Sequence, residues 1–245
     1  MNQSEAGSIL LAHTSNGHIM PVLMSNVSHA DVQTQFARIA TPENPFRFKS
    51  GAVLDDVTVA YETWGQLNSG KNNAILLFHA LSGSQHAAGV CRAVPGTGQR
   101  WSADCQEGWW DLFIGPGKAL DTNKFFVICA NYLGGCYGSS GPASINATTG
   151  KPYGADFPPV STADVVRSQA ALLDLLGITQ VHAVIGASIG GLTAFSVSPV
   201  SRFPALGGTT PARLLTSSRA SGDNTAVMFA AVSAGLRNVS TVCPN

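Results

Sequence analysis

The chain has 245 residues, 44% of them apolar, which is enough to bury the core of one large domain or two small ones. Its 14 basic and 14 acidic residues give a formal net charge of zero, so no electrostatic attraction draws it to nucleic acid or to an anionic membrane. Only 11% of the residues are charged; with 26 glycines and 13 prolines, this excludes coiled-coil, fibrous and acidic disordered classes.

The first 37 residues are expected to form a loose N-terminal extension, because Ser, Asn, His and Gly are mixed there without periodicity. No basic residue precedes the mild apolar stretch near Ile9, the first being Arg38, so the stretch lacks the pattern of a secretion signal. No apolar run approaches the roughly 18 residues that cross a bilayer. We therefore expect a soluble, cytoplasmic chain whose folded core begins near residue 38.

Three segments in the first half of the chain have the patterns of β-strands. Residues 52–64 alternate apolar and polar side chains toward their end, as an edge or antiparallel strand does. Residues 73–78 and 125–130 are short, continuous apolar runs, which are typical of strands buried on both faces of a parallel sheet. The second and third segments are therefore predicted at the centre of the sheet.

Residues 161–176 are predicted to form a helix. Their apolar residues recur close to every 3.6 positions, a Ser-x-x-Asp capping signal opens the segment, and Gly177 follows its end. A further short apolar strand is predicted at residues 181–185. A strand, a helix and a strand in this order form a βαβ unit, so the sequence predicts an α/β fold.

A glycine-bounded serine follows this strand directly, as Gly186-x-Ser188-x-Gly190. The pattern fits a nucleophile elbow, a sharp strand-to-helix turn that lifts one hydroxyl out of the sheet, although a plain glycine-rich turn remains the alternative. The tip residue lies in strained backbone space, so the residues two before and two after it must lack a Cβ. The following helix would point its N-terminus at the site, and the Ile189 N–H is the expected first half of an oxyanion hole.

The second half of the oxyanion hole is expected from the loop at residues 79–83, which follows the central strand predicted at residues 73–78. We expect the backbone N–H of Leu81 to donate to the oxyanion. His79 has two interpretations: a strand-end histidine hydrogen-bonded to the backbone, or a residue that shapes the loop and so aims the Leu81 N–H.

Several distinctive blocks follow one another along the sequence: AYETWG at 60–65, HALSG at 79–83, WWD at 109–111, IGPGK at 114–118, NYLGGCYGSSGP at 131–142, GKPYG at 150–154 and GASIGG at 186–191. Together these blocks resemble homoserine O-acetyltransferases of the α/β-hydrolase superfamily. The resemblance covers residues 38–195. It implies an α/β-hydrolase catalytic core over that range, with a mostly parallel sheet and flanking helices.

The resemblance also implies a two-step acyl transfer that serves methionine biosynthesis. Ser188 would take the acetyl group from acetyl-CoA, and the hydroxyl of L-homoserine would remove it, with the N–H groups of Leu81 and Ile189 as the oxyanion hole. Acetyl-CoA would be a substrate, with no bound cofactor and no metal, and the chain would form a homodimer. Members of the group also use succinyl-CoA or L-serine, so both the acyl donor and the acceptor stay open.

The sequence departs from this family after Ser188. Serine needs a histidine base oriented by an acid, in the chain order serine, acid, histidine. No histidine follows Ser188, and Asp223 is the single acid after it. Residues 196–245 read as an atypical low-charge tail, so we expect the C-terminal part of the fold to be missing. The strand predicted at 181–185 would then be an unprotected sheet edge.

These departures leave three hypotheses: a homoserine O-acetyltransferase with an incomplete site, active or inactive, a general esterase, or a non-catalytic remnant that binds CoA or a partner. His79 or His86 is considered as a substitute base, against the simpler expectation that a loop histidine such as His86 is solvated.

Several other residues have simple structural interpretations. Trp109 and Trp110 are expected to be packing aromatics rather than a stacking platform, and Cys136 a small buried residue. Lys118 and Lys151 are expected to be solvated lysines rather than CoA-phosphate ligands. The five cysteines, an odd number with no CxxC pair, predict neither a disulfide scaffold nor a zinc site.

Overall fold

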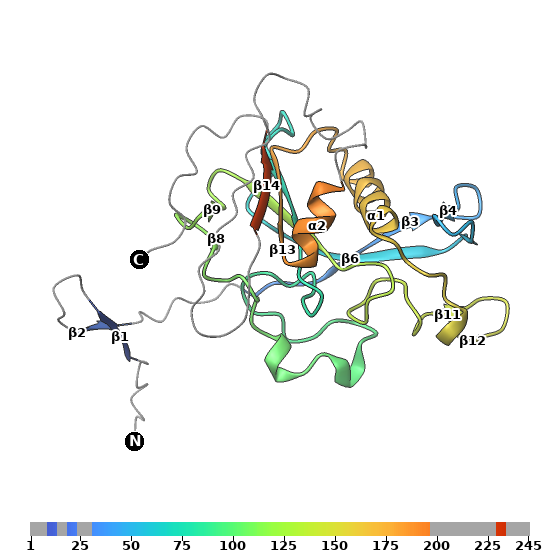
Figure 1. Ribbon diagram of the computed structural model, residues 1–245, viewed down its shortest axis with the longest axis horizontal. Helices are drawn as coiled ribbons and strands as arrows, with labels where there is room; N and C mark the ends of the chain where they lie inside the picture. The colour runs from blue at the N-terminus through green and yellow to red at the C-terminus, as the bar shows by residue number, and fades with distance from the viewer. Residues whose placement is uncertain (1–8, 14–18, 24–30, 197–228, 234–245) are drawn as a thin grey trace. The chain divides into compact units, whose positions relative to one another are not determined.

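The computed structural model describes residues 9–13, 19–23, 31–196 and 229–233 (Figure 1). The chain divides into two compact units, residues 1–31 and 32–245, which are described separately. In the first unit, the strands β1 (Ile9–His13) and β2 (Ile19–Leu23) pair as an antiparallel hairpin within the segment expected to be a loose extension.

The second unit is built around a six-stranded sheet in the order β14-β13-β7-β10-β6-β3. Its strands are β3 (Gln35–Ala40), β6 (Val57–Trp64), β7 (Ala74–Phe78), β10 (Phe126–Ala130), β13 (Ala183–Ala187) and β14 (Phe229–Ser233). The three central strands β13, β7 and β10 are parallel, and β6, β3 and β14 run antiparallel to their neighbours. The prediction of a parallel α/β sheet with β7 and β10 at its centre is confirmed.

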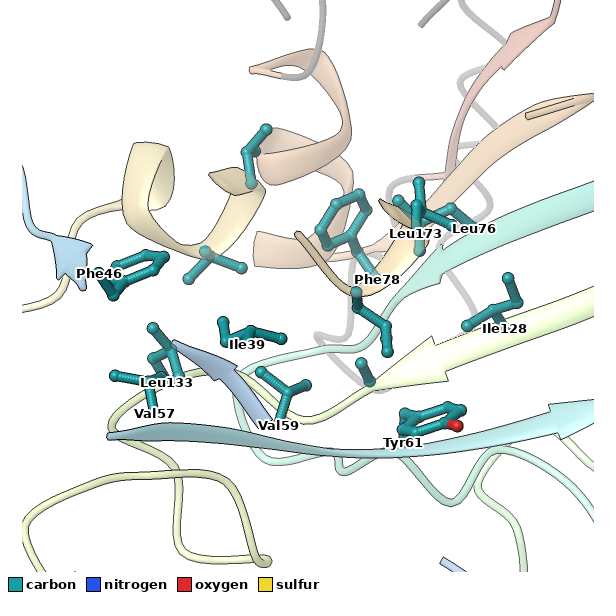
Figure 2. Close-up of a cluster of buried hydrophobic side chains, with 14 of the residues drawn as sticks. Ile39, Phe46, Val57, Val59, Tyr61, Leu76, Phe78, Ile128, Leu133 and Leu173 are labelled. Atoms are coloured by element: carbon teal, nitrogen blue, oxygen red, sulfur yellow. The ribbon is translucent and has the colours of Figure 1, made fainter. Parts of the chain in front are cut away.

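Every residue of β7 is buried because apolar layers cover both faces of the sheet. Leu76 and Phe78 point into a cluster shared with the helices α1 (Thr162–Leu175) and α2 (Ile189–Phe195), part of which Figure 2 shows. Ile75 and Leu77 point into a second cluster on the opposite face, built with residues from the connecting loops. The continuous apolar run of β7 is the consequence of this two-sided burial.

The capping signal at residues 161–164 forms a capping box at the start of α1. The Ser161 side chain accepts from the Asp164 N–H, and the Asp164 carboxylate accepts from the Ser161 N–H at 2.9 Å. Asp164 is buried, and it also accepts from the Lys49 N–H at 2.8 Å and pairs with Arg167. Gly177 follows the C-cap residue Leu176 with a φ of 65°, the left-handed conformation typical of the C′ position. The predicted helix is confirmed.

The shorter elements lie in the connecting loops. They are the paired strands β4 (Phe46–Arg47) and β5 (Val53–Leu54), β8 (Ile114–Gly115) and β9 (Leu120–Asp121), and β11 (Ile145–Asn146) and β12 (Lys151–Pro152), with the 3₁₀ turns η1 (Gly98–Arg100), η2 (Ala103–Cys105) and η3 (Gly154–Asp156). Among the described residues, none of the helices has both the length and the apolar character of a membrane span.

The predicted unprotected edge at residues 181–185 is wrong. The strand β14, which comes from the segment expected to be an atypical tail, pairs antiparallel with β13 from Ala183 to Ala187. Its sequence, FAAVS, is a short run of small and apolar residues, which is compatible with a strand beside a buried neighbour. The backbone groups of β13 are therefore paired on both sides, with β7 and with β14.

Replacing the helix cap tests the role of the capping box. Ser161→Ala should lower the free energy of unfolding by about 1 kcal/mol, because it removes the acceptor for the Asp164 N–H. Urea denaturation followed by circular dichroism measures the change. Thr162→Ala, at the exposed next position, is the matched control and should shift stability by less than about 0.5 kcal/mol; equal losses in the two variants would contradict a capping role.

Candidate active site

Ser188 lies at the tip of a sharp turn between β13 and α2. Its φ of 55° and ψ of −125° place it in backbone space that a residue with a side chain rarely occupies. The side chain is exposed, although the strand before it is largely buried. The strained conformation, the buried strand and the helix that starts at Ile189 reproduce the geometry expected of a nucleophile elbow.

The two glycines of the motif are required by close backbone contacts. A Cβ on Gly186 would lie 2.2 Å from the carbonyl oxygen of Gly190, as the steric interpretation of the motif predicts. A Cβ on Gly190 would meet different atoms, the carbonyl oxygens of Phe78 and His79 at 2.3 and 2.6 Å. Gly190 therefore lets the start of α2 approach the end of β7, a reason that the motif alone does not reveal.

The loop expected to complete the oxyanion hole begins at the same edge of the sheet. The parallel strands β13 and β7 are paired with Gly186 opposite Phe78, so both chains leave the sheet side by side. The loop turns back through a hydrogen bond from the Gly83 N–H to the Ala80 carbonyl at 2.9 Å, and the Leu81 side chain is 79% exposed. Among the described residues, no loop or side-chain acceptor takes a hydrogen bond from the Leu81 or Ile189 N–H.

His79 is buried at the base of this loop. Its Nδ1 lies 2.7 Å from the Ala80 carbonyl, so Nδ1 carries the proton, and its ring stacks on Tyr132 at 3.8 Å between centroids. The Tyr132 hydroxyl donates to the His79 carbonyl at 2.6 Å. Burial lowers the pKa of His79 from 6.5 to about 4, although the bond to Ala80 opposes the shift. The interpretation of His79 as a strand-end histidine bonded to the backbone is confirmed, and a role in aiming the Leu81 N–H stays a prediction.

His86 is not the solvated loop histidine that the sequence suggested. It is buried, with Nδ1 2.7 Å from the Glu62 carboxylate and Nε2 2.9 Å from the Gln106 carbonyl. Both ring nitrogens are occupied, so His86 offers no free lone pair to the Ser188 hydroxyl. Sequence reasoning missed its partner because Glu62 lies on β6, 24 residues earlier in the chain.

The structure confirms some of the remaining sequence expectations and contradicts others. Trp109 and Trp110 pack against the second apolar cluster, which confirms them as packing aromatics. Cys136 is exposed, so its interpretation as a buried residue is wrong. Lys118 is not simply solvated, because its ammonium contacts the carboxylate of Asp111 at 3.1 Å; Lys151 is exposed. Asp223 and Cys243 lie outside the described residues.

Comparison with known proteins gives a consistent result. The family model described as alpha/beta hydrolase fold matches residues 73–205. The chain is 50% identical over 179 residues to a homoserine O-acetyltransferase of Symbiobacterium thermophilum, covering 73% of this chain and 43% of that protein. It is 53% identical over 163 residues to a homoserine O-succinyltransferase of Methylibium petroleiphilum, covering 64% of this chain and 40% of that protein.

Two solved structures are also similar. A homoserine O-acetyltransferase from Bacillus anthracis superimposes with a TM-score of 0.58 at 37% identity, covering 69% of this chain and 43% of that one. The esterase E22 superimposes with a TM-score of 0.59 at 39% identity, covering 69% of this chain and 44% of that one. The chain thus spans less than half the length of these relatives.

Adding a single methyl group at the elbow tests its packing. Gly186→Ala places a Cβ against the Gly190 carbonyl oxygen, which belongs to the rigid backbone, so we expect a loss of about 1–3 kcal/mol in stability. Gly70→Ala is the control, because a Cβ there would meet only ordinary contacts at 3.6 Å. Thermal denaturation of both variants measures the difference, and a Gly186→Ala protein as stable as the control would show that the elbow is looser than described.

The buried state of His79 predicts a pH dependence of stability. Its pKa in the folded protein, about 4, lies below the ordinary value of 6.5, so the unfolded chain binds the proton more readily between these values. The stability contributed by the neutral ring is complete above pH 6.5 and is lost as the pH falls toward 4, by about 3 kcal/mol. The stability difference between wild type and His79→Gln should shrink by that amount from pH 7 to pH 4 in denaturant titrations. A constant difference would mean that His79 is not neutralised by burial.

Proposed function

The chain belongs to the α/β-hydrolase family, and from this membership we propose that it transfers an acetyl group from acetyl-CoA to the hydroxyl of L-homoserine through an acyl intermediate on Ser188. The observation that carries the proposal is the exposed Ser188 hydroxyl, held at positive φ directly before the N-terminus of α2. The 50% identity to a homoserine O-acetyltransferase supports the choice of substrates. No metal or bound cofactor enters the reaction, since acetyl-CoA is consumed as a substrate.

In the first step, the Ser188 oxygen attacks the thioester carbonyl of acetyl-CoA. The C–S bond breaks, an ester forms on the serine, and the CoA sulfur leaves with the proton that the serine loses. In the second step, the homoserine hydroxyl attacks this ester, and its proton returns to Ser188 as O-acetylhomoserine departs. The carbonyl oxygen becomes negative twice, and the N–H groups of Leu81 and Ile189 would stabilise it each time.

Proton transfer is the weak part of this site. No histidine follows Ser188 in the sequence, both nitrogens of His86 are occupied, and the low pKa of His79 makes it a weak base. Loss of a triad member from serine hydrolases lowers turnover by about 10⁴–10⁶-fold. We therefore expect acylation of Ser188 to be detectable and turnover to be slow. In keeping with the family, we further propose a cytoplasmic homodimer.

A second candidate function is ester hydrolysis, in which water rather than homoserine removes the acyl group. The superposition on esterase E22, with a TM-score of 0.59, favours it as the alternative. The two activities require the same nucleophile and oxyanion hole and differ only in the acceptor. A third possibility is a remnant that binds CoA or a partner chain without chemistry.

Labelling with radioactive acetyl-CoA separates these functions. Wild-type protein should acquire label that Ser188→Ala does not, and added L-homoserine should release it as the O-acetyl ester. Release that is independent of homoserine, together with hydrolysis of p-nitrophenyl acetate, would indicate the esterase. Thermal stabilisation by CoA without any labelling would indicate the remnant, and equal labelling of wild type and Ser188→Ala would refute the role of Ser188.

A further inference from the structure

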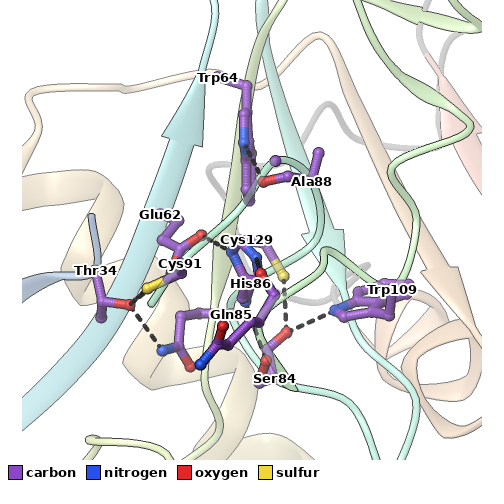
Figure 3. Close-up of polar contacts among 12 residues, drawn as sticks. Thr34, Glu62, Trp64, Ser84, Gln85, His86, Ala88, Cys91, Trp109 and Cys129 are labelled. Carbon is purple, nitrogen blue, oxygen red and sulfur yellow. Dashed lines mark hydrogen bonds and ion pairs between the residues drawn. The ribbon is translucent and has the colours of Figure 1, made fainter. Parts of the chain in front are cut away.

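A buried polar network lies on the face of the sheet opposite α1 and α2 (Figure 3). Its centre is the pair of Glu62 on β6 and His86, whose side chains are both 0% exposed. His86 comes three residues after the turn at residues 80–83, which carries Leu81. The pair therefore joins the end of the loop that begins at residue 79, called the oxyanion loop below, to the sheet. Neither residue takes part in the acyl-transfer steps described above.

Hydrogen-bond partners occupy both ring nitrogens of this histidine. The His86 Nε2 lies 2.9 Å from the Gln106 carbonyl oxygen, and Nδ1 lies 2.7 Å from a Glu62 carboxyl oxygen. His86 is therefore bonded directly to Glu62 on one side and to the backbone on the other. The other Glu62 oxygen accepts from the Thr34 hydroxyl at 2.6 Å, and Thr34 accepts from the Gln85 amide at 3.0 Å.

The same residues belong to a group with metal-ligand chemistry. Atoms of Glu62, His86 and Cys91 that are able to bind a metal lie within 4.8 Å of one another. A metal needs an open lone pair on histidine, however, and both His86 nitrogens already face other partners, Glu62 and the Gln106 carbonyl. Burial and the Glu62 charge raise the pKa of the Cys91 thiol, which keeps the sulfur protonated. The arrangement is that of a closed ion pair.

The segment that follows the oxyanion turn is held on its other side as well. The Trp109 indole N–H donates to the Ser84 carbonyl at 2.9 Å, and the backbone N–H of Trp110 donates to the Ala87 carbonyl at 2.8 Å. Before the turn, the Tyr132 hydroxyl holds the His79 carbonyl. Residues 81 and 82 are therefore an exposed tip between two buried anchors.

We propose that Glu62 and His86 are positioning residues for the oxyanion loop. Their ion pair fixes residues 84–88 against β6, and this fixes how far the Leu81 N–H stands above the sheet beside Ser188. A buried ion pair adds little net stability compared with apolar residues of the same size, but it fixes direction because its hydrogen bonds require one geometry. The inference rests on the proposed function, since the Leu81 N–H matters as part of an oxyanion hole.

The test uses a conservative and a disruptive variant at one position. In Glu62→Gln, the amide oxygen still accepts from Thr34, and the amide N–H donates to a neutral His86 that keeps its bond to Gln106, so the loop stays in place. In Glu62→Leu, the Thr34 hydroxyl and the His86 Nδ1 lose their acceptor. Leu172→Ala is the control, because it opens a cavity beneath α1 and leaves the hydrogen bonds of Glu62, Thr34 and His86 in place.

Two measurements are made on the full chain. The first is the rate of Ser188 acetylation by saturating p-nitrophenyl acetate, from the burst of p-nitrophenol. We expect Glu62→Leu to acylate about 10–100-fold more slowly with unchanged ester affinity, Glu62→Gln to stay within about threefold of wild type, and Leu172→Ala to be unaffected. The second is amide hydrogen exchange, which needs no activity and should accelerate selectively in residues 79–88 of Glu62→Leu.

The outcomes separate this inference from the proposed function. Wild-type acylation and exchange rates in Glu62→Leu, or an equal slowing in Leu172→Ala, would overturn the positioning role. If the wild type is not acetylated at all, the proposed function fails and the exchange data alone decide the loop anchoring. If Glu62→Leu does not fold, Thr34→Val removes two hydrogen bonds of the network, those to Glu62 and from Gln85, and should accelerate exchange in residues 79–88. If the purified protein contains one equivalent of zinc, Glu62, His86 and Cys91 form a metal site, and the proposed role of a Glu62–His86 pair is overturned.

Discussion

Three stretches of backbone meet almost without intervening side chains at the carboxyl ends of β13 and β7, and the candidate site depends on this contact. Gly186 leaves room for the Gly190 carbonyl, and Gly190 leaves room for the carbonyls of Phe78 and His79. Because the backbones are this close, α2 must begin immediately after Ser188, and its N-terminus must lie beside the start of the oxyanion loop. The strained φ of Ser188 is then imposed by its surroundings, which is the condition under which such strain persists in a native protein.

The two faces of the sheet contribute differently to this site. The face beneath α1 and α2 is apolar, and it supplies the burial that holds β13, β7 and β10 together. The opposite face carries the second apolar cluster and, beside it, the Glu62–His86 pair with its polar neighbours. The oxyanion loop lies between a histidine stacked on Tyr132 before the turn and a histidine bonded to the Glu62 carboxyl group after it.

For the proposed acyl transfer, the described residues offer groups suited to anion stabilisation more completely than groups suited to proton transfer. An exposed serine, a helix N-terminus and a free loop amide are local products of strand, turn and helix. A base for the serine is not such a local product, because the acid and the histidine of this kind of triad come from separate parts of the chain. His182 precedes β13 and lies at the end of that strand away from Ser188. The chain spans less than half the length of the homoserine O-acetyltransferase that it resembles.

The sequence by itself determined what depends on neighbouring residues. The apolar runs of β7 and β10, the capping box of α1 and the glycine spacing around Ser188 are local signals, and all of them are confirmed. Only the tertiary structure decided which distant groups meet. The Glu62–His86 pair, the partners of Gly190, the Asp111 contact of Lys118 and the pairing of β14 with β13 join residues whose separation carries no periodic signal. Local patterns reflect the repeat of one helix or strand, whereas long-range contacts arise only when the sheet order places those elements side by side.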